Sequence, residues 1–177
     1  MVAASPAPVV RFACADDADA IGRIHVVSWR AAYVNVLPGD YLAGLSITDR
    51  QRAWRRWFIA SHRSARVLVV ADGETVVGFA CVGASRDDDA AAATGELQSI
   101  YLDPAKWGLG LGRLLHAEAL ATLRRDGYRR ATLWVLDGNA VARRFYERAG
   151  WTEDGATKVD TIGSSPPLKE VRYLRAL

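Results

Sequence analysis

The segment ELQSIYLDPAKWGLGLGRLL, residues 96–115, contains the pattern from which we predict the fold. It begins as a strand-like apolar run, stops at Asp103-Pro104, and continues through three glycines into a helical pattern. The glycines are Gly108, Gly110 and Gly112. Glycine allows positive φ and close approach of a ligand to the main chain, and the helix that follows offers unpaired N–H groups and the positive end of its dipole. A strand, a glycine loop and a helix in this order predict an anion site, and the expected anion is a phosphate ester.

Composition and charge narrow the class of protein. The 177 residues, half of them apolar and 24% charged, suit one globular domain with a substantial core. The net charge of +3 is carried mainly by arginines spread along the chain, not by the clustered basic surface that nucleic-acid binding needs. No apolar run reaches membrane-spanning length, and residues 1–8 lack the features of a secretion signal. We expect a cytoplasmic protein without nucleic-acid or membrane partners.

Hydrophobic periodicity and turn residues divide the rest of the chain into strands and helices. Residues 1–8 are expected to form a disordered tail, and residues 9–177 a single domain. The predicted strands cover residues 9–14, 66–72, 75–85, 97–102, 131–136, 151–160 and 168–177. The predicted helices begin at Asp16 or Asp17, Ile47, Leu111 and Asn139, and end near Trp29, Ser61, Gly127 and Gly150. The fold class is therefore α/β (α+β), a mixed central sheet of about seven strands with about four helices in the order βααβββαβαββ.

Several residues outside the opening segment allow more than one interpretation. Cys14 and Cys81 lie in apolar, strand-like contexts, which favours buried free thiols in a reducing compartment over a disulfide. His25 is interpreted as a histidine at the edge of the core. The acidic run 87–89 either attracts a cationic ligand or, as the favoured alternative, belongs to a mobile solvated loop.

The segment 29–42 is rich in aromatic residues around a turn at Pro38-Gly39. Its aromatic residues are Trp29, Tyr33 and Tyr41. Two interpretations stay open for this segment: it forms the wall of a ligand pocket, or it forms the packed corner between two helices.

Asn139 and Tyr146 form a second pair of interest. They are seven residues apart in the last predicted helix, so they lie almost on one face, with the small Ala142 between them. That face suits a long, thin ligand. In the alternative interpretation, Asn139 only caps the helix and Tyr146 only packs at its edge.

Three segments together resemble the GNAT superfamily of acyl-CoA-dependent N-acetyltransferases. They are IYLDP at 100–104, WGLGLGRLL at 107–115 and NAVARRFYERAGW at 139–151, and the predicted order of elements from Val9 to Leu174 also resembles that fold. The family's glycine loop follows the pattern Q/R-x-x-G-x-G/A, which Gly110 and Gly112 match. Trp107 stands where glutamine or arginine is usual, so Lys106 or Arg113 would have to supply the missing side-chain donor.

The resemblance implies a single N-acetyltransferase domain that moves an acetyl group from acetyl-CoA to a primary amine of a small molecule or peptide, without a metal. The implied ligands of acetyl-CoA are Ile100, Tyr101, Leu102, Trp107, Gly108, Leu109, Gly110, Leu111, Gly112, Arg113 and Asn139. The loop 107–113 would hold the pyrophosphate through main-chain N–H groups, and residues 100–102 would pair with the pantetheine arm. Dimers are common in the family, and the sequence does not distinguish a homodimer from a monomer.

The resemblance also implies catalytic roles. Tyr146 matches the general acid that protonates the departing thiolate, and Glu96 matches a general base, acting directly or through water. The Leu102 N–H would polarise the thioester carbonyl. Trp29 and Tyr33 are the candidate acceptor-binding residues, and a merely structural Glu96 remains the alternative.

Two other functions remain open at this point. A non-catalytic acyl-CoA-binding regulatory module would keep the same loop with less need of Glu96 and Tyr146. A dinucleotide oxidoreductase is disfavoured, because Arg113 stands where the G-x-G-x-x-G fingerprint needs its last glycine.

Overall fold

The fold is seen in a computed structural model that describes residues 7–60, 65–161 and 165–177. The strands are β1 (Val9–Phe12), β2 (Ala65–Asp72), β3 (Thr75–Ala84), β4 (Thr94–Leu102), β5 (Arg130–Leu136), β6 (Thr152–Asp160) and β7 (Leu168–Ala176). The α-helices are α1 (Ala18–Ala32), α2 (Gly39–Gly44), α3 (Ile47–Ile59), α4 (Leu111–Arg125) and α5 (Ala140–Arg148). Short 3₁₀ turns, η1 (Ala15–Asp17) and η2 (Pro104–Lys106), precede α1 and follow β4. The predicted fold class is confirmed, apart from the additional short helix α2.

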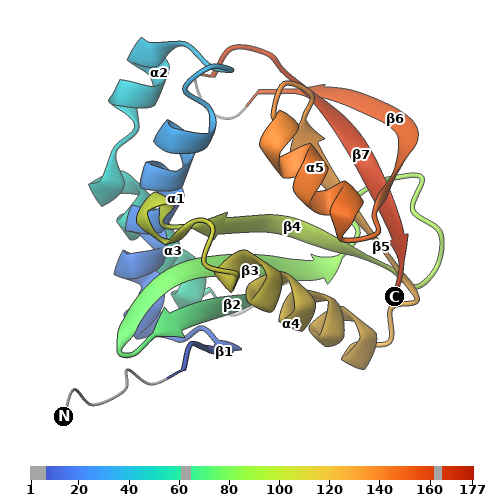
Figure 1. Cartoon of the computed structure of the whole chain (residues 1–177), viewed down its shortest axis with the longest axis horizontal. Coiled ribbons are helices and arrows are strands. Elements are labelled where there is room, and N and C mark those ends of the chain that lie inside the picture. Colours follow the sequence, from blue (N-terminus) through green and yellow to red (C-terminus); the bar gives the residue numbers. More distant parts are fainter. Residues whose placement is uncertain (1–6, 61–64, 162–164) are drawn as a thin grey trace.

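The seven strands form one mixed sheet in the order β1-β2-β3-β4-β5-β7-β6. All neighbours are antiparallel except β4 and β5, which pair in parallel only at 94–96 with 130–132. Strand β4 also bulges opposite β3, where the pair Val82 and Leu97 is followed by Cys81 and Ser99. Figure 1 shows the two arms of the sheet, β1–β4 and β5–β7, diverging beyond this short contact. The sheet is therefore open between β4 and β5 on the side of Leu102.

Helices cover both faces of the sheet. One core lies between the sheet and α4 and α5, and it contains Leu115, Leu123, Tyr146 and Tyr173. A second core, under α1 and α3, contains Ile21, Ile24, Phe58 and Phe79. A third, smaller core joins Trp29, Tyr33, Leu37 and Leu42 to Leu136 of β5 and Leu168 of β7. Each fully buried apolar side chain contributes about 1.5–3 kcal/mol to folding, so these cores fix the arms around the opening.

Several local predictions need correction. Helix α2 follows Pro38, where only a turn was predicted, because proline restricts its own φ and leaves the next residues free to start a helix. Cys14 is exposed because edge strand β1 already ends at Phe12, whereas Cys81 is a buried free thiol as predicted. The predicted tail over residues 1–8 lies outside the described residues except for residues 7 and 8, and Ser61 lies outside them as well.

Candidate active site

The free edge of β4 lines the opening. The Asp103 N–H donates to the Val77 carbonyl at 2.8 Å, so the peptide groups that alternate with it, those of Leu102 and Ile100, face away from β3. The Leu102 carbonyl accepts hydrogen bonds from Ser28 Oγ at 2.6 Å and from Trp107 Nε1 at 3.1 Å. The strand end is thus held from α1 and from the loop, while its peptide edge faces the opening.

The glycine loop leads from η2 into α4. Gly108 and Gly110 have φ of 80° and 82°, a conformation that other residues rarely adopt, and Gly110 is the N-cap of α4. A Cβ atom on either glycine would meet no protein atom within 4 Å, so the outer side of the loop is open to a ligand. Gly112 lies inside α4, where an added Cβ would lie 3.6 Å from Leu102 and 4.0 Å from Phe145. The loop therefore presents the helix N-terminus beside the free edge of β4.

Charged and aromatic side chains fix the loop from outside. Lys106 pairs with Asp72 at 2.8 Å, and Asp103 pairs with Arg23 at 2.8 Å. Trp107 is half exposed, and its indole N–H donates to the Leu102 carbonyl. This residue departs from the family pattern, and its hydrogen bond helps to hold the loop against the end of β4. Arg113 is exposed and has no ion pair within the described part of the chain. Of the two candidate donors, Arg113 is the one whose charge is available.

Tyr146 lies on α5, at the core that also contains Ile100 and Leu102. Burial, with a smaller effect of nearby Tyr101, raises the pKa of Tyr146 above its usual value, so the phenol stays protonated at neutral pH. Asn139 caps the same helix, because its Oδ1 accepts from the Ala142 N–H at 3.1 Å. Both residues are buried, as expected for one face of α5, and Tyr146 is oriented by packing against Trp151.

Glu96 lies at the closed end of the opening, in the last residue pair between β4 and β5. Its side chain is 1% exposed. One oxygen accepts from the Arg86 main-chain N–H and from Arg86 Nε, each at 3.0 Å, and the other accepts from Arg86 Nη2 at 2.5 Å. Residue spacing does not predict this partner, because Arg86 is brought to Glu96 by the β3–β4 connection.

Trp29 and Tyr33 pack edge to face at 5.0 Å in the third core, with Tyr101 of β4 against them. Burial, and then the neighbouring Tyr101 and Tyr146, raise the pKa of Tyr33 well above its usual value, and Glu170 acts in the same direction. The structure therefore brings Trp29 and Tyr33 close to Tyr101 and Tyr146. Glu170 of β7 was not predicted. Its signal in the sequence is a carboxylate on the strand face that it shares with Leu168.

Two carboxylates of the acidic run 87–89 have partners on the sheet. Asp89 accepts from both terminal nitrogens of Arg172, at 2.6 and 2.8 Å, and Asp87 accepts from Trp134 Nε1 at 2.8 Å. Arg172 also lies 3.3 Å from Asp87. These partners offset the charge of two of the three carboxylates, while Asp88 and Asp89 are exposed, as predicted for a solvated loop.

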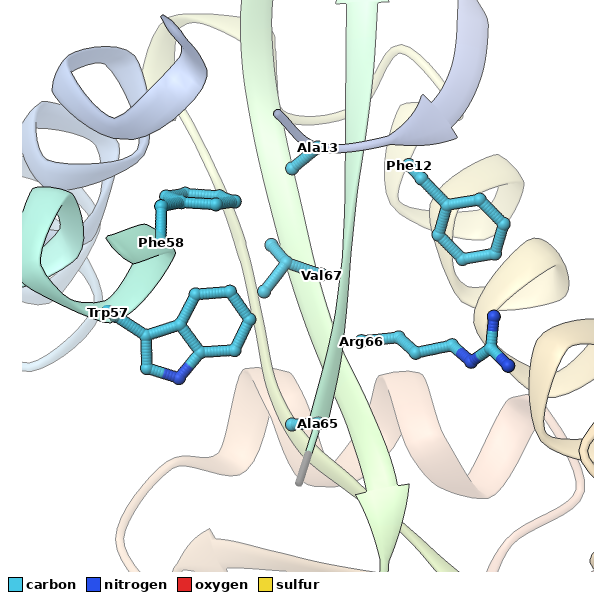
Figure 2. A pocket seen from close by; sticks show the side chains of 7 residues that line it. All are labelled: Phe12, Ala13, Trp57, Phe58, Ala65, Arg66 and Val67. Atoms are coloured by element: carbon cyan, nitrogen blue, oxygen red, sulfur yellow. The ribbon is translucent and has the colours of Figure 1, made fainter. Parts of the chain in front are cut away.

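A separate hollow of about 240 Å³ lies beside β1 and β2, at one edge of the sheet and away from the opening between β4 and β5 (Figure 2). Its lining residues are Phe12, Ala13, Trp57, Phe58, Ala65, Arg66 and Val67. Arg66 pairs with Asp126 at 2.9 Å and stacks on Phe12. The hollow carries none of the groups described above, and we do not assign the site to it.

Among residues 7–60, 65–161 and 165–177, no three His, Cys, Asp or Glu side chains are grouped so as to hold a metal ion. Over the same ranges, no helix has the length and apolar character needed to cross a membrane.

Comparisons with known proteins agree with the geometry. A family model described as the acetyltransferase (GNAT) family matches residues 27–151. The uncharacterized N-acetyltransferase YuaI of Bacillus subtilis strain 168 is 33% identical over 132 residues, 73% of this chain and 72% of the relative. The L-methionine sulfoximine/L-methionine sulfone acetyltransferase of Salmonella typhimurium strain LT2 is 32% identical over 145 residues, 81% of this chain and 79% of the relative. The PaiA N-acetyltransferase of Thermoplasma acidophilum, solved with coenzyme A, has a TM-score of 0.73 at 18% identity and covers 97% of this chain and 100% of its own.

Proposed function

Because the chain belongs to the acetyltransferase (GNAT) family, we propose that it transfers the acetyl group of acetyl-CoA to a primary amine by direct attack in a ternary complex. One observation carries the proposal. The free peptide edge of Ile100 and Leu102 runs along the opening from the glycine loop toward a core in which Tyr146 is buried. A phosphate-bearing, narrow thioester fits such an arrangement, because it needs an anion site, an extended channel and a proton donor in sequence.

The donor would be held mainly by the main chain. The N–H groups of the first turn of α4, after the open Gly108 and Gly110, suit the pyrophosphate, and Arg113 adds a positive charge. The edge of residues 100–102 suits the amide groups of the pantetheine arm. The proposed contacts comprise Ile100, Tyr101, Leu102, Trp107, Gly108, Leu109, Gly110, Leu111, Gly112, Arg113 and Asn139.

The proposed chemistry uses three groups of the chain. The Leu102 N–H stabilises the oxyanion that forms when the amine nitrogen bonds to the carbonyl carbon. Tyr146 donates its phenolic proton to the sulfur as the carbon–sulfur bond breaks, and the newly acylated nitrogen then returns its extra proton to the phenolate. Glu96 takes the proton that the ammonium must lose before attack, through one water, because an ionised carboxylate has about four acceptor positions and Arg86 uses three of them.

The acceptor class is proposed from the substrates for which one relative is named. The Salmonella typhimurium protein is named for L-methionine sulfoximine and L-methionine sulfone, which are compact amino acids with one primary amine. We therefore place α-amino acids first among the acceptors to be tested, ahead of polyamines and peptides.

A thiol-release assay with acetyl-CoA and a broad amine panel tests the proposal. We expect release of CoA above the rate of spontaneous hydrolysis with at least one primary amine. Calorimetric titration with CoA serves as the companion measurement. Tight binding of CoA without release for any amine would instead support the non-catalytic acyl-CoA-binding module.

A further inference from the structure

A group of polar side chains, which we call the acceptor wall, lies at the open end of the sheet on the face covered by α1. It consists of Trp29, Tyr33, Tyr101 and Glu170. Glu170 pairs in register with Leu136 of β5, and cross-strand neighbours point to the same face of a sheet. Because Leu136 belongs to the third core with Trp29 and Tyr33, Glu170 lies on the face of the sheet that this core covers.

The acceptor wall adjoins the proposed proton donor. Tyr101 packs in the third core with Trp29 and Tyr33, and its chain neighbours Ile100 and Leu102 pack against the core that contains Tyr146. A molecule contacting the wall would therefore lie next to the sulfur that Tyr146 is proposed to protonate. This places the wall on the side of the opening from which an amine would attack.

The wall contains a buried donor without a hydrogen bond of normal geometry. Trp29 is 6% exposed, and its Nε1–H interacts with the Tyr101 hydroxyl but forms no hydrogen bond of normal geometry with any described residue. Buried donors in native proteins are almost always paired, so an unpaired one indicates a missing ligand or water. An N–H donor requires an acceptor atom, which an oxygen of the bound molecule would supply.

Glu170 differs from Glu96 in how it is paired. Three N–H donors from Arg86 surround Glu96, whereas the ion pair of Glu170 is with Lys158 Nζ, at 3.3 Å. The same Nζ lies 4.4 Å from the centre of the Trp134 ring. An ammonium between a carboxylate and an aromatic face has the geometry of a bound alkylammonium. The surroundings of Glu170 already accommodate one primary ammonium, that of Lys158.

Burial makes a further cation favourable at Glu170. Its side chain is 15% exposed, and burial raises the pKa of the carboxyl. Lys158 opposes this rise, Asp160 adds to it, and Arg86 opposes it more weakly. A ligand ammonium would further offset the cost of burying the charge. A second positive charge on the same ligand, however, would meet Lys158 and Arg86.

We propose that Glu170 binds the ammonium group of the acceptor and that Trp29 Nε1–H binds an oxygen of the same molecule, with Tyr33 and Tyr101 between them. The inference rests on the proposed function and names the acceptor class: a compact monoamine that carries an oxygen acceptor near its amine, as an α-amino acid does. Polyamines are disfavoured by the two cations beside Glu170.

The test uses the full chain, with L-methionine sulfone and spermidine as probes at saturating acetyl-CoA. Glu170→Gln should raise the KM for L-methionine sulfone about ten- to a hundredfold, the usual worth of a hydrogen bond to a charged group, and leave the KM for acetyl-CoA unchanged. Trp29→Phe, which keeps an aromatic ring without the N–H, should raise the same KM by a smaller factor. Glu118→Gln is the control, because Glu118 pairs with Arg125 on α4, on the other face of the sheet.

Lys158→Met separates recognition from structural support. If Glu170 binds the acceptor, removing Lys158 removes an internal competitor, and the KM for L-methionine sulfone falls while Glu170→Gln raises it. Equal losses of melting temperature in both variants, with neither KM moved, would show that the pair only supports β6 and β7 and would overturn the inference. A better kcat/KM for spermidine than for every α-amino acid would also overturn it.

The proposed function and this inference fail separately. If the wild-type protein releases CoA with amines and Glu170→Gln behaves like the wild type, the acceptor wall is wrong and the transferase stands. If no amine gives release of CoA, calorimetric titration of L-methionine sulfone into the CoA-saturated protein tests whether the acceptor wall binds this ligand. Weaker binding by Glu170→Gln than by Glu118→Gln would still support the wall, and equal binding would overturn it.

Discussion

The two sides of the opening are made of different chemical groups. The donor side, residues 100–113, presents mainly main-chain N–H groups from one continuous segment. The acceptor wall presents side chains of Trp29, Tyr33, Tyr101 and Glu170, which come from the region of α1, from β4 and from β7. A main-chain site depends on the path of the backbone, so it should fail when the backbone is strained. A side-chain site should fail when a single functional group is removed and the backbone is intact.

The largest effect on cofactor binding is expected on the donor side, from Gly110→Val. Valine at φ 82° is strained, and its side chain would enter the open space outside the loop. We expect a loss of about 3 kcal/mol in CoA binding, on the order of a hundredfold in Kd, measured by calorimetry.

Gly155→Val is the matched control for that variant. Gly155 has φ of 87° and an equally open Cβ position, but it lies in β6. Both variants should lower the melting temperature to a similar extent, since the backbone strain is similar. Retained CoA affinity in Gly110→Val would remove the phosphate site from the loop, and equal loss in Gly155→Val would show a global effect.

Tyr146→Phe tests the group that stands between the two sides. The ring and its packing against Trp151 remain, while the proton donor is lost. We expect kcat to fall about a hundredfold or more with unchanged affinity for CoA. Tyr128→Phe provides the comparison, because Tyr128 packs at the edge of the same core on the far side of α4. An unchanged rate of the chemical step would exclude Tyr146 as the acid.

His25 supports the acceptor wall from behind, stacked on Tyr101 at 5.1 Å. Burial, and then the charge of Arg50, lower the pKa of His25 to about 3, and its Nδ1 has no partner among the described residues. Below pH 6.5 the unfolded chain binds a proton at this residue and the folded chain does not, so the free energy of unfolding falls as the pH falls. His25→Phe removes this contribution.

We therefore expect His25→Phe to gain about 2 kcal/mol of stability relative to the wild type between pH 8 and pH 5. Denaturant titrations at the two pH values measure the difference. A gain of equal size at both pH values would mean that His25 is not held neutral. Buried His116, whose pKa is lowered to about 4, is present in both proteins, so its contribution cancels.

The contrast between a main-chain site and a side-chain site also explains which features the sequence predicts. Gly108, Gly110 and the start of α4 are neighbours along the chain, and a conformation that requires glycine leaves a direct trace in the sequence. The strands were equally readable, because β2 and β3 are continuous apolar runs. Helix α2 was missed, since six residues do not establish a helical period.

The side-chain contacts left no such trace. Arg86 and Glu96 are ten positions apart in the sequence, and Asp89 and Arg172 are 83 positions apart. Glu170 shares a sheet face with Leu136 and the third core only because β5 and β7 pair in one particular register. These contacts depend on the tertiary fold, so residue type and spacing predict the chemistry of each partner without predicting which partners meet.

Trp107→Phe should have the smallest effect. It tests a side-chain contact that lies within the donor side. The variant removes one hydrogen bond to the Leu102 carbonyl and keeps an aromatic ring over the loop. Ser28 Oγ still bonds the same carbonyl at 2.6 Å, so the strand end stays anchored. A single neutral hydrogen bond contributes about 0.5–1.5 kcal/mol, which predicts a rise of only a few-fold in the KM for acetyl-CoA. An effect as large as that of Gly110→Val would show that the loop depends on this side chain as much as on its glycines, and the distinction between a main-chain donor side and a side-chain acceptor wall would no longer hold.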